Sequence, residues 1–68
     1  MVLIFGKENC PYTRSAREDY ARRDVDFEFI DVRGNPTEMD RMLGYSNGRR
    51  QVPVIVEDGH VTIGFGGT

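Results

Sequence analysis

The sequence predicts an α/β domain with a mixed four-stranded sheet and the element order β-α-β-α-β-β. Two strand-like segments, 2–5 and 26–32, are each followed by a helix-like segment, which is the pattern of parallel strands joined by right-handed crossovers. A third strand-like segment, 52–57, leads through Asp58-Gly59 into a fourth. This two-residue turn matches the twist of an antiparallel hairpin, so the last two strands are expected to pair antiparallel.

The first half of the chain begins with an apolar strand at 2–5, followed by a loop at Gly6–Asn9. Pro11 suits the first turn of a helix, where its missing N–H would be unpaired in any case. The helix is expected to run to Arg23, with its charged side chains toward water. The residues expected to face the core are Tyr12, Ala16 and Tyr20.

The second half begins with segment 26–32, which alternates polar and apolar residues as a strand does. Asn35 and Pro36 have the composition of an N-cap and a first helical position. The second helix is expected to bury Met39, Met42 and Leu43 and to end within Gly44–Gly48. Strand 52–57, the Asp58-Gly59 turn, strand 60–63 and a glycine-rich ending complete the predicted order.

Composition narrows the class of protein. The 68 residues form one small domain, 1–68, with a net charge of -2 and interspersed charges, which predicts no general attraction to nucleic acid. No apolar run is long enough to span a membrane, and one cysteine with one histidine cannot build a zinc site. Because a single cysteine forms no internal disulfide, the chain is expected to occupy a reducing compartment, the cytoplasm.

The cysteine, Cys10, is the main candidate for chemistry. It stands between the first strand and the first helix, with Lys7 three residues before it. The first N–H groups of a helix and the positive end of its dipole favour a thiolate over a thiol. Because only the thiolate is a nucleophile, this position predicts a reactive sulfur rather than an inert buried one.

Three separated segments resemble the glutaredoxins, which are small members of the thioredoxin fold. They are Cys10-Pro11-Tyr12, Gln51-Val52-Pro53 with its expected cis-proline, and Gly66-Gly67. The segments Arg50–Pro53 and Gly64-Phe65 are also similar to the glutaredoxin-like redoxins that reduce ribonucleotide reductase.

The resemblance implies a role for each matching residue. Cys10 would be the nucleophile, and Lys7 would face both the thiolate and the glycyl carboxylate of glutathione. Val52 would pair its backbone with the cysteinyl part of the tripeptide, as a strand edge does in peptide recognition. The residues implied in binding the substrate are Lys7, Tyr12, Thr13, Gln51, Val52, Pro53, Gly67 and Thr68.

The chain departs from the family pattern at two places. Thr13 occupies the position of the second cysteine in the dithiol form, so the resemblance implies a monothiol CPYT variant in which Thr13 donates a hydrogen bond to the thiolate. Glutaredoxins also continue past the glycine pair with an acidic residue and a third helix. Without that helix, an uncovered sheet face would expose apolar side chains, which predicts a homodimer through that face.

A bacterial group of glutaredoxin-like (seleno)proteins is similar as well, and its members carry a cysteine or selenocysteine just after a glycine-rich stretch. That similarity implies a native gene that continues past Thr68 with a residue able to resolve a Cys10 disulfide. Sequencing of the gene downstream of this codon tests the expectation.

The sequence therefore predicts a thiol–disulfide oxidoreductase in which Cys10 exchanges with protein disulfides. Glutathione or another low-molecular-weight thiol would be the co-substrate, with no tightly bound cofactor. One alternative is a monothiol iron–sulfur cluster carrier, although Pro11-Tyr12-Thr13 differs from the Gly-Phe-Ser usual in those carriers. The other is a non-catalytic interaction module of the thioredoxin fold.

Overall fold

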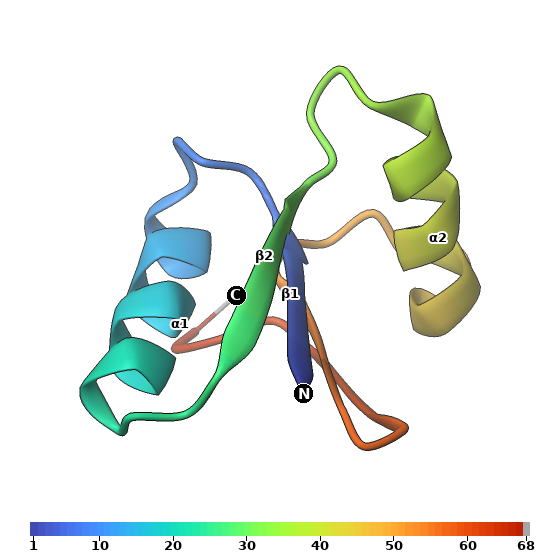
Figure 1. Cartoon of the computed structure of the whole chain (residues 1–68). Coiled ribbons are helices and arrows are strands. Elements are labelled where there is room, and N and C mark those ends of the chain that lie inside the picture. The colour runs from blue at the N-terminus through green and yellow to red at the C-terminus, as the bar shows by residue number, and fades with distance from the viewer. Residues whose placement is uncertain (68) are drawn as a thin grey trace.

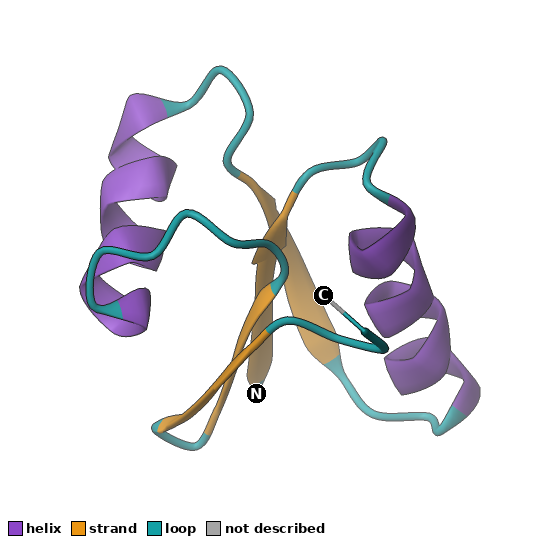
Figure 2. Ribbon diagram, turned by 180° about the vertical axis from the view of Figure 1, so that it is seen from behind, coloured by secondary structure: helices purple, strands orange, loops and turns teal. Residues whose placement is uncertain are grey.

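The computed structural model describes residues 1–67 and has the predicted element order. Two helices and four strands are arranged as Figures 1 and 2 show. The elements are β1 (Val2–Gly6), α1 (Pro11–Arg22), β2 (Phe27–Asp31), α2 (Pro36–Ser46), β3 (Val54–Glu57) and β4 (His60–Ile63).

The sheet has the strand order β2-β1-β3-β4. β1 pairs parallel with β2, so that Gly6 lies opposite Asp31. β3 pairs antiparallel with both β1 and β4. The hairpin turn is formed by Asp58 and Gly59, both with positive φ (50° and 81°), the backbone geometry that suits a tight two-residue connection. The mixed four-stranded sheet predicted from the sequence is therefore confirmed.

Each face of the sheet carries one helix, α1 on one side and α2 on the other (Figure 1). Because strand side chains alternate between faces, the sheet contributes to two separate cores. The core under α2 contains Phe5, Ile30, Val32, Met42, Val54 and Val56. The core under α1 contains Val2, Ile4, Ala16, Tyr20 and Ile55, with Phe65 of the C-terminal segment packed against it.

The structure corrects the predicted start of the third strand and the predicted burial of Tyr12, and it confirms that the second helix ends within Gly44–Gly48. α2 continues through Gly44 to Ser46 and ends at Asn47, whose φ of 58° places it in the left-handed region. β3 begins at Val54 rather than at position 52, because Val52-Pro53 forms a cis peptide before the ladder starts. Tyr12 is 40% exposed and lies outside the core.

The predicted apolar sheet face is absent from the described part of the chain. On β4, the side chains that share the face of α1 are His60 and Thr62, and both are exposed. The exposed large apolar residues in 1–67 are Met1, Tyr12 and Tyr45, none of them in a strand. A homodimer therefore stays a prediction, but without the apolar patch on which it depended.

Within residues 1–67, neither helix combines the length and the apolar character that crossing a membrane requires.

Candidate active site

One end of the sheet collects the connections that carry the predicted site residues. β1 and β2 finish there, at Gly6 and Asp31, and β3 begins there, because Val54 pairs with Phe5. The loop before α1 and the loop before α2 both rise from this end, whereas the β3–β4 hairpin lies at the other (Figure 1). We call these the Cys10 end and the hairpin end of the sheet.

Cys10 is the N-cap residue of α1, with an extended backbone (φ -86°, ψ 121°) and partial exposure. The loop before it closes through a hydrogen bond from the Cys10 N–H to the Lys7 carbonyl oxygen, 3.1 Å long. Pro11 follows as the first helical residue, where its lack of an N–H costs nothing. The sulfur therefore lies where the unpaired N–H groups of the first helical turn can reach it.

The surroundings of Cys10 stabilise the thiolate. Burial raises the pKa of the Cys10 thiol, but hydrogen bonds outweigh this effect. The pKa is lowered by the Thr13 N–H, the Thr13 hydroxyl and the Tyr12 N–H, which can donate to the thiolate, and by the charge of Lys7. The pKa of Cys10 is therefore lower than that of an ordinary thiol, as reactive cysteines require.

Thr13 is fully buried beneath Cys10. Its hydroxyl oxygen accepts a hydrogen bond from the Lys7 N–H at 3.4 Å, which leaves the hydroxyl proton free to donate to the Cys10 sulfur. One side chain thus links the loop before the cysteine to the cysteine itself. The Thr13 side chain can thus act on the sulfur as a hydrogen-bond donor.

Gly6 allows this arrangement because it lies against Thr13. A Cβ at position 6 would be 2.5 Å from both Cγ2 and Oγ1 of Thr13. No real side-chain carbon approaches others so closely, so only glycine fits here without a shift. Sequence reasoning missed Gly6, whose one signal was a glycine at the end of the strand that leads into the cysteine loop.

Thr13→Val is expected to raise the pKa of Cys10, because valine keeps the shape of threonine but cannot donate a hydrogen bond to the sulfur. The variant should also lose about 1 kcal/mol of unfolding free energy, since the Lys7 N–H loses its acceptor. Thr13→Ser keeps the hydroxyl and is the matched control. Alkylation rate against pH measures the first effect and urea unfolding the second; equal pKa values in the valine and serine variants would contradict this role.

The third predicted segment lies at the same end of the sheet. Val52 is half-buried, Pro53 is buried, and their peptide bond is cis, as expected from the resemblance. The Pro53 carbonyl oxygen accepts a hydrogen bond from the Gly64 N–H at 2.8 Å, so β3 and the end of β4 are tied together before the glycine pair. Gln51 is exposed and adjacent to Val52.

The glycine-rich ending comes back toward α1. A Cβ at Gly67 would lie 3.9 Å from Cε1 of Tyr12, so this backbone borders the exposed tyrosine ring. The structure therefore brings the first and last predicted segments together. Thr68, predicted as a further contact, lies outside the described residues.

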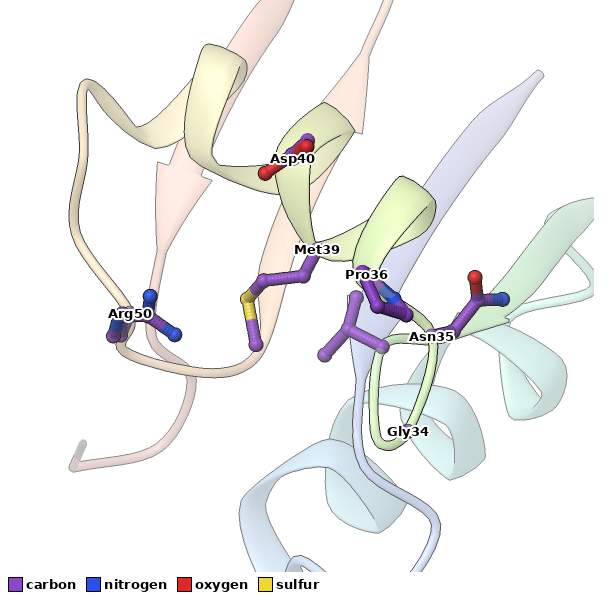
Figure 3. A pocket seen from close by; sticks show the side chains of 7 residues that line it. Gly34, Asn35, Pro36, Met39, Asp40 and Arg50 are labelled. Atoms are coloured by element: carbon purple, nitrogen blue, oxygen red, sulfur yellow. The ribbon is translucent and has the colours of Figure 1, made fainter.

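A separate pocket of about 390 Å³ lies on the α2 side and does not include Cys10. Figure 3 shows the Met39 side chain extending from α2 toward the loop that carries Arg50. The pocket is lined by Val32, Gly34, Asn35, Pro36, Met39, Asp40 and Arg50. This cavity could not be predicted from the sequence, because its wall combines the β2–α2 connection, the start of α2 and the α2–β3 connection, which meet only in the folded chain.

In residues 1–67, no three histidine, cysteine or acidic side chains are grouped closely enough to hold a metal ion.

Comparisons with known proteins agree with this geometry. The glutaredoxin family profile matches residues 2–62. The glutaredoxin-like 8.6 kDa protein of the rubredoxin operon of Clostridium pasteurianum is 29% identical over 65 residues, which cover 96% of this chain and 85% of that protein.

Among solved structures, glutaredoxin grx-1 from Archaeoglobus fulgidus superposes with a TM-score of 0.85 at 27% identity, over 96% of this chain and 75% of that one. NrdH-redoxin from Escherichia coli, a glutaredoxin-like protein described as having a thioredoxin-like activity profile, gives 0.80 at 25% identity, over 94% and 82%. These matches confirm the thioredoxin-like α/β fold. A family profile that covers most of the sequence, joined to this fold, shows that the chain belongs to the glutaredoxin family.

Proposed function

We propose that this protein is a monothiol thiol–disulfide oxidoreductase in which Cys10 is the nucleophile. The observation that carries the proposal is the position of the Cys10 sulfur at the N-terminus of α1, where donors from Tyr12 and Thr13 stabilise its thiolate. A lowered thiol pKa increases the fraction of nucleophile at neutral pH.

The exchange proceeds in two balanced steps. The Cys10 thiolate attacks one sulfur of a substrate disulfide, a bond forms between the two sulfurs, and the other substrate sulfur leaves as a thiolate. A second thiolate then attacks the mixed disulfide, releases the Cys10 thiolate and carries the disulfide away. Residues 1–68 contain one cysteine, so the second thiol comes either from an external thiol or from a cysteine or selenocysteine beyond Thr68.

Glutathione is the proposed second thiol. Val52 and cis-Pro53 stand at the Cys10 end of the sheet, where an extended tripeptide could pair with the backbone. Lys7 supplies a cation for a carboxylate, and the Tyr12 ring lies beside the Gly67 backbone. Gln51 is exposed next to this edge.

Intact mass after incubation with oxidised glutathione tests the proposal. We expect one added glutathione, on Cys10, that reduced glutathione removes. Absence of the adduct in the folded protein would contradict the proposal. An adduct that glutathione leaves in place, while a dithiol removes it, would retain the chemistry of Cys10 but reject glutathione as the second thiol.

A second experiment on the same purified protein distinguishes the proposed oxidoreductase from an iron–sulfur cluster carrier. Anaerobic reconstitution with iron, sulfide and glutathione should give no visible absorbance, because the rigid Pro11 and the exposed, bulky Tyr12 differ from the Gly-Phe-Ser sequence usual in those carriers. A brown, dimeric product would favour the carrier function instead.

A further inference from the structure

The positive charges of this domain form two groups with different partners. In the first group, the arginines on the outer surfaces of the helices are already engaged. The ion pairs are Arg22–Asp19 at 2.9 Å, Arg23–Asp19 at 2.8 Å and Arg41–Glu38 at 3.1 Å. Arg17 lies over the Phe29 ring, 4.0 Å from its centroid. These charges are therefore largely neutralised or covered within the domain.

The second group makes no ion pair anywhere in residues 1–67. Its members lie in the connections and the first helical turn that border the Cys10 end of the sheet. They are Lys7 in the loop before Cys10, Arg14 in the first turn of α1, Arg33 in the loop before α2, and Arg49 and Arg50 in the loop before β3. We call them the Cys10-end cations.

Among residues 1–67, the acidic residues without an ion pair nearest to these cations, Glu8, Asp31 and Asp40, are fewer than the five cations. The Asp31 carboxylate accepts the Arg33 N–H at 2.9 Å, and Glu38 is held by Arg41. Glu8 and Asp40 are exposed and form no ion pair in the described structure.

The hairpin end carries the opposite excess. Its exposed acidic residues are Asp24, Asp26, Glu57 and Asp58. Although the net charge is -2, the charges are unevenly distributed: the Cys10 end of the sheet is positive and the hairpin end is negative. Such a distribution orients a charged partner before contact.

We propose that the protein substrate of this site is a disulfide flanked by acidic residues, which the Cys10-end cations bind. This inference rests on the proposed function and names the class of its substrate. Arg14 lies one helical turn after Cys10, and its N–H donates to the Cys10 carbonyl oxygen at 3.0 Å, so its side chain starts on the same side of α1 as the cysteine. Arg33 and Arg50 come from two other connections, and Arg50 also lines the pocket beside α2. Carboxylates on both sides of a substrate disulfide can contact them while the sulfur reaches Cys10.

The spread of the cations favours a protein segment over a small thiol. A tripeptide such as glutathione presents two carboxylates, whereas the cations occupy four separate stretches of chain around the cysteine. An extended segment covers about 3.3 Å per residue, so several flanking acidic side chains are needed to meet them. Nucleic acid would satisfy the charges but offers no disulfide to Cys10.

Single-turnover rates with two synthetic peptides test the inference. Each peptide carries one cysteine as a mixed disulfide with 2-mercaptoethanol, flanked by three Glu in one peptide and three Lys in the other. Cys10 attacks the peptide sulfur, forms the protein–peptide disulfide and releases 2-mercaptoethanol as a thiolate that takes a proton from water. Intact mass follows the adduct, and the rate of a small neutral thiol with each peptide corrects for the intrinsic reactivity of the disulfides.

After this correction, we expect the acidic peptide to react at least about tenfold faster at low ionic strength. The preference should nearly vanish in 1 M salt, where screening acts within about 3 Å. Arg14→Gln/Arg33→Gln should lose most of the preference. The matched control Arg22→Gln/Arg41→Gln changes the net charge equally but away from the site, and it should retain the preference.

Equal corrected rates for the two peptides, a preference unaffected by salt, or equal losses in the two double variants would overturn the inference. Each of these results leaves the proposed function intact, because adducts still form. If neither peptide nor a small neutral disulfide reacts, the proposed function fails and the inference fails with it. If the Arg14/Arg33 variant fails to fold, the inference is still tested, because the salt dependence of the peptide preference is measured on the unmodified protein.

Discussion

Cys10→Ser is expected to abolish exchange with disulfides, with a rate loss of more than about 10³-fold. A serine hydroxyl at this position is not ionised at neutral pH and forms no disulfide, so the donors around it have no thiolate to stabilise. Single-turnover reaction with oxidised glutathione, followed by intact mass, measures the loss.

The same variant is expected to remain folded, which separates lost chemistry from lost structure. Position 10 is the N-cap of α1, and the neutral thiol makes no side-chain capping hydrogen bond there; the N–H groups of Tyr12 and Thr13 stabilise the ionised sulfur. Serine is among the favoured N-cap residues, so the variant should be as stable as the original chain or more stable. Residual exchange in a folded Cys10→Ser protein would remove Cys10 from the centre of the proposed chemistry.

Gly6→Ala is expected to lower the free energy of unfolding by about 2–3 kcal/mol. The new methyl group would lie 2.5 Å from two atoms of the buried Thr13, and both residues are held by backbone hydrogen bonds of β1 and α1. To relieve this overlap, the start of α1 must move away from β1. This movement also displaces the Tyr12 and Thr13 groups that stabilise the Cys10 thiolate. Urea unfolding measures the first effect and the rate of Cys10 alkylation the second.

Gly44→Ala is the matched control, since it makes the same change within α2. Nothing lies within 4 Å of a Cβ at this position, and the backbone there is helical. Alanine should therefore stabilise the protein by about 0.5–1 kcal/mol. If both alanine variants changed stability by the same amount, the contact between Gly6 and Thr13 would have no special energetic importance.

Local patterns were sufficient to predict much of this fold. The apolar run before the cysteine, the Pro36 helix start and the Asp58-Gly59 turn each depend on neighbours in sequence, and each is confirmed. Boundaries that depend on tertiary packing were less accurate. The second helix was expected to end within Gly44–Gly48, but the exact residue was not predictable: Leu43 packs against the α2-side core and Ser46 is buried, so the helix continues past Gly44 to Ser46.

In the site, too, local features were predicted from the sequence and features that depend on tertiary packing were not. The position of Cys10 before a proline-led helix predicted its N-cap geometry, because that feature is local. The contact between Gly6 and Thr13 joins a strand end to a helix start through side-chain volume, which no periodicity reveals. Likewise, the separation of paired helix arginines from the unpaired Cys10-end cations requires knowing which acidic groups lie within reach.

Alkylation of Cys10 against pH tests the central claim most directly. The chain has one cysteine, so every alkylated molecule reports on that sulfur. Because the donors of Thr13 and Tyr12 and the charge of Lys7 outweigh the effect of burial, the pKa of Cys10 is lowered, and the midpoint of alkylation should lie below the ordinary thiol value of about 8.5. A midpoint at or above that value in the folded protein would contradict thiolate stabilisation by the start of α1.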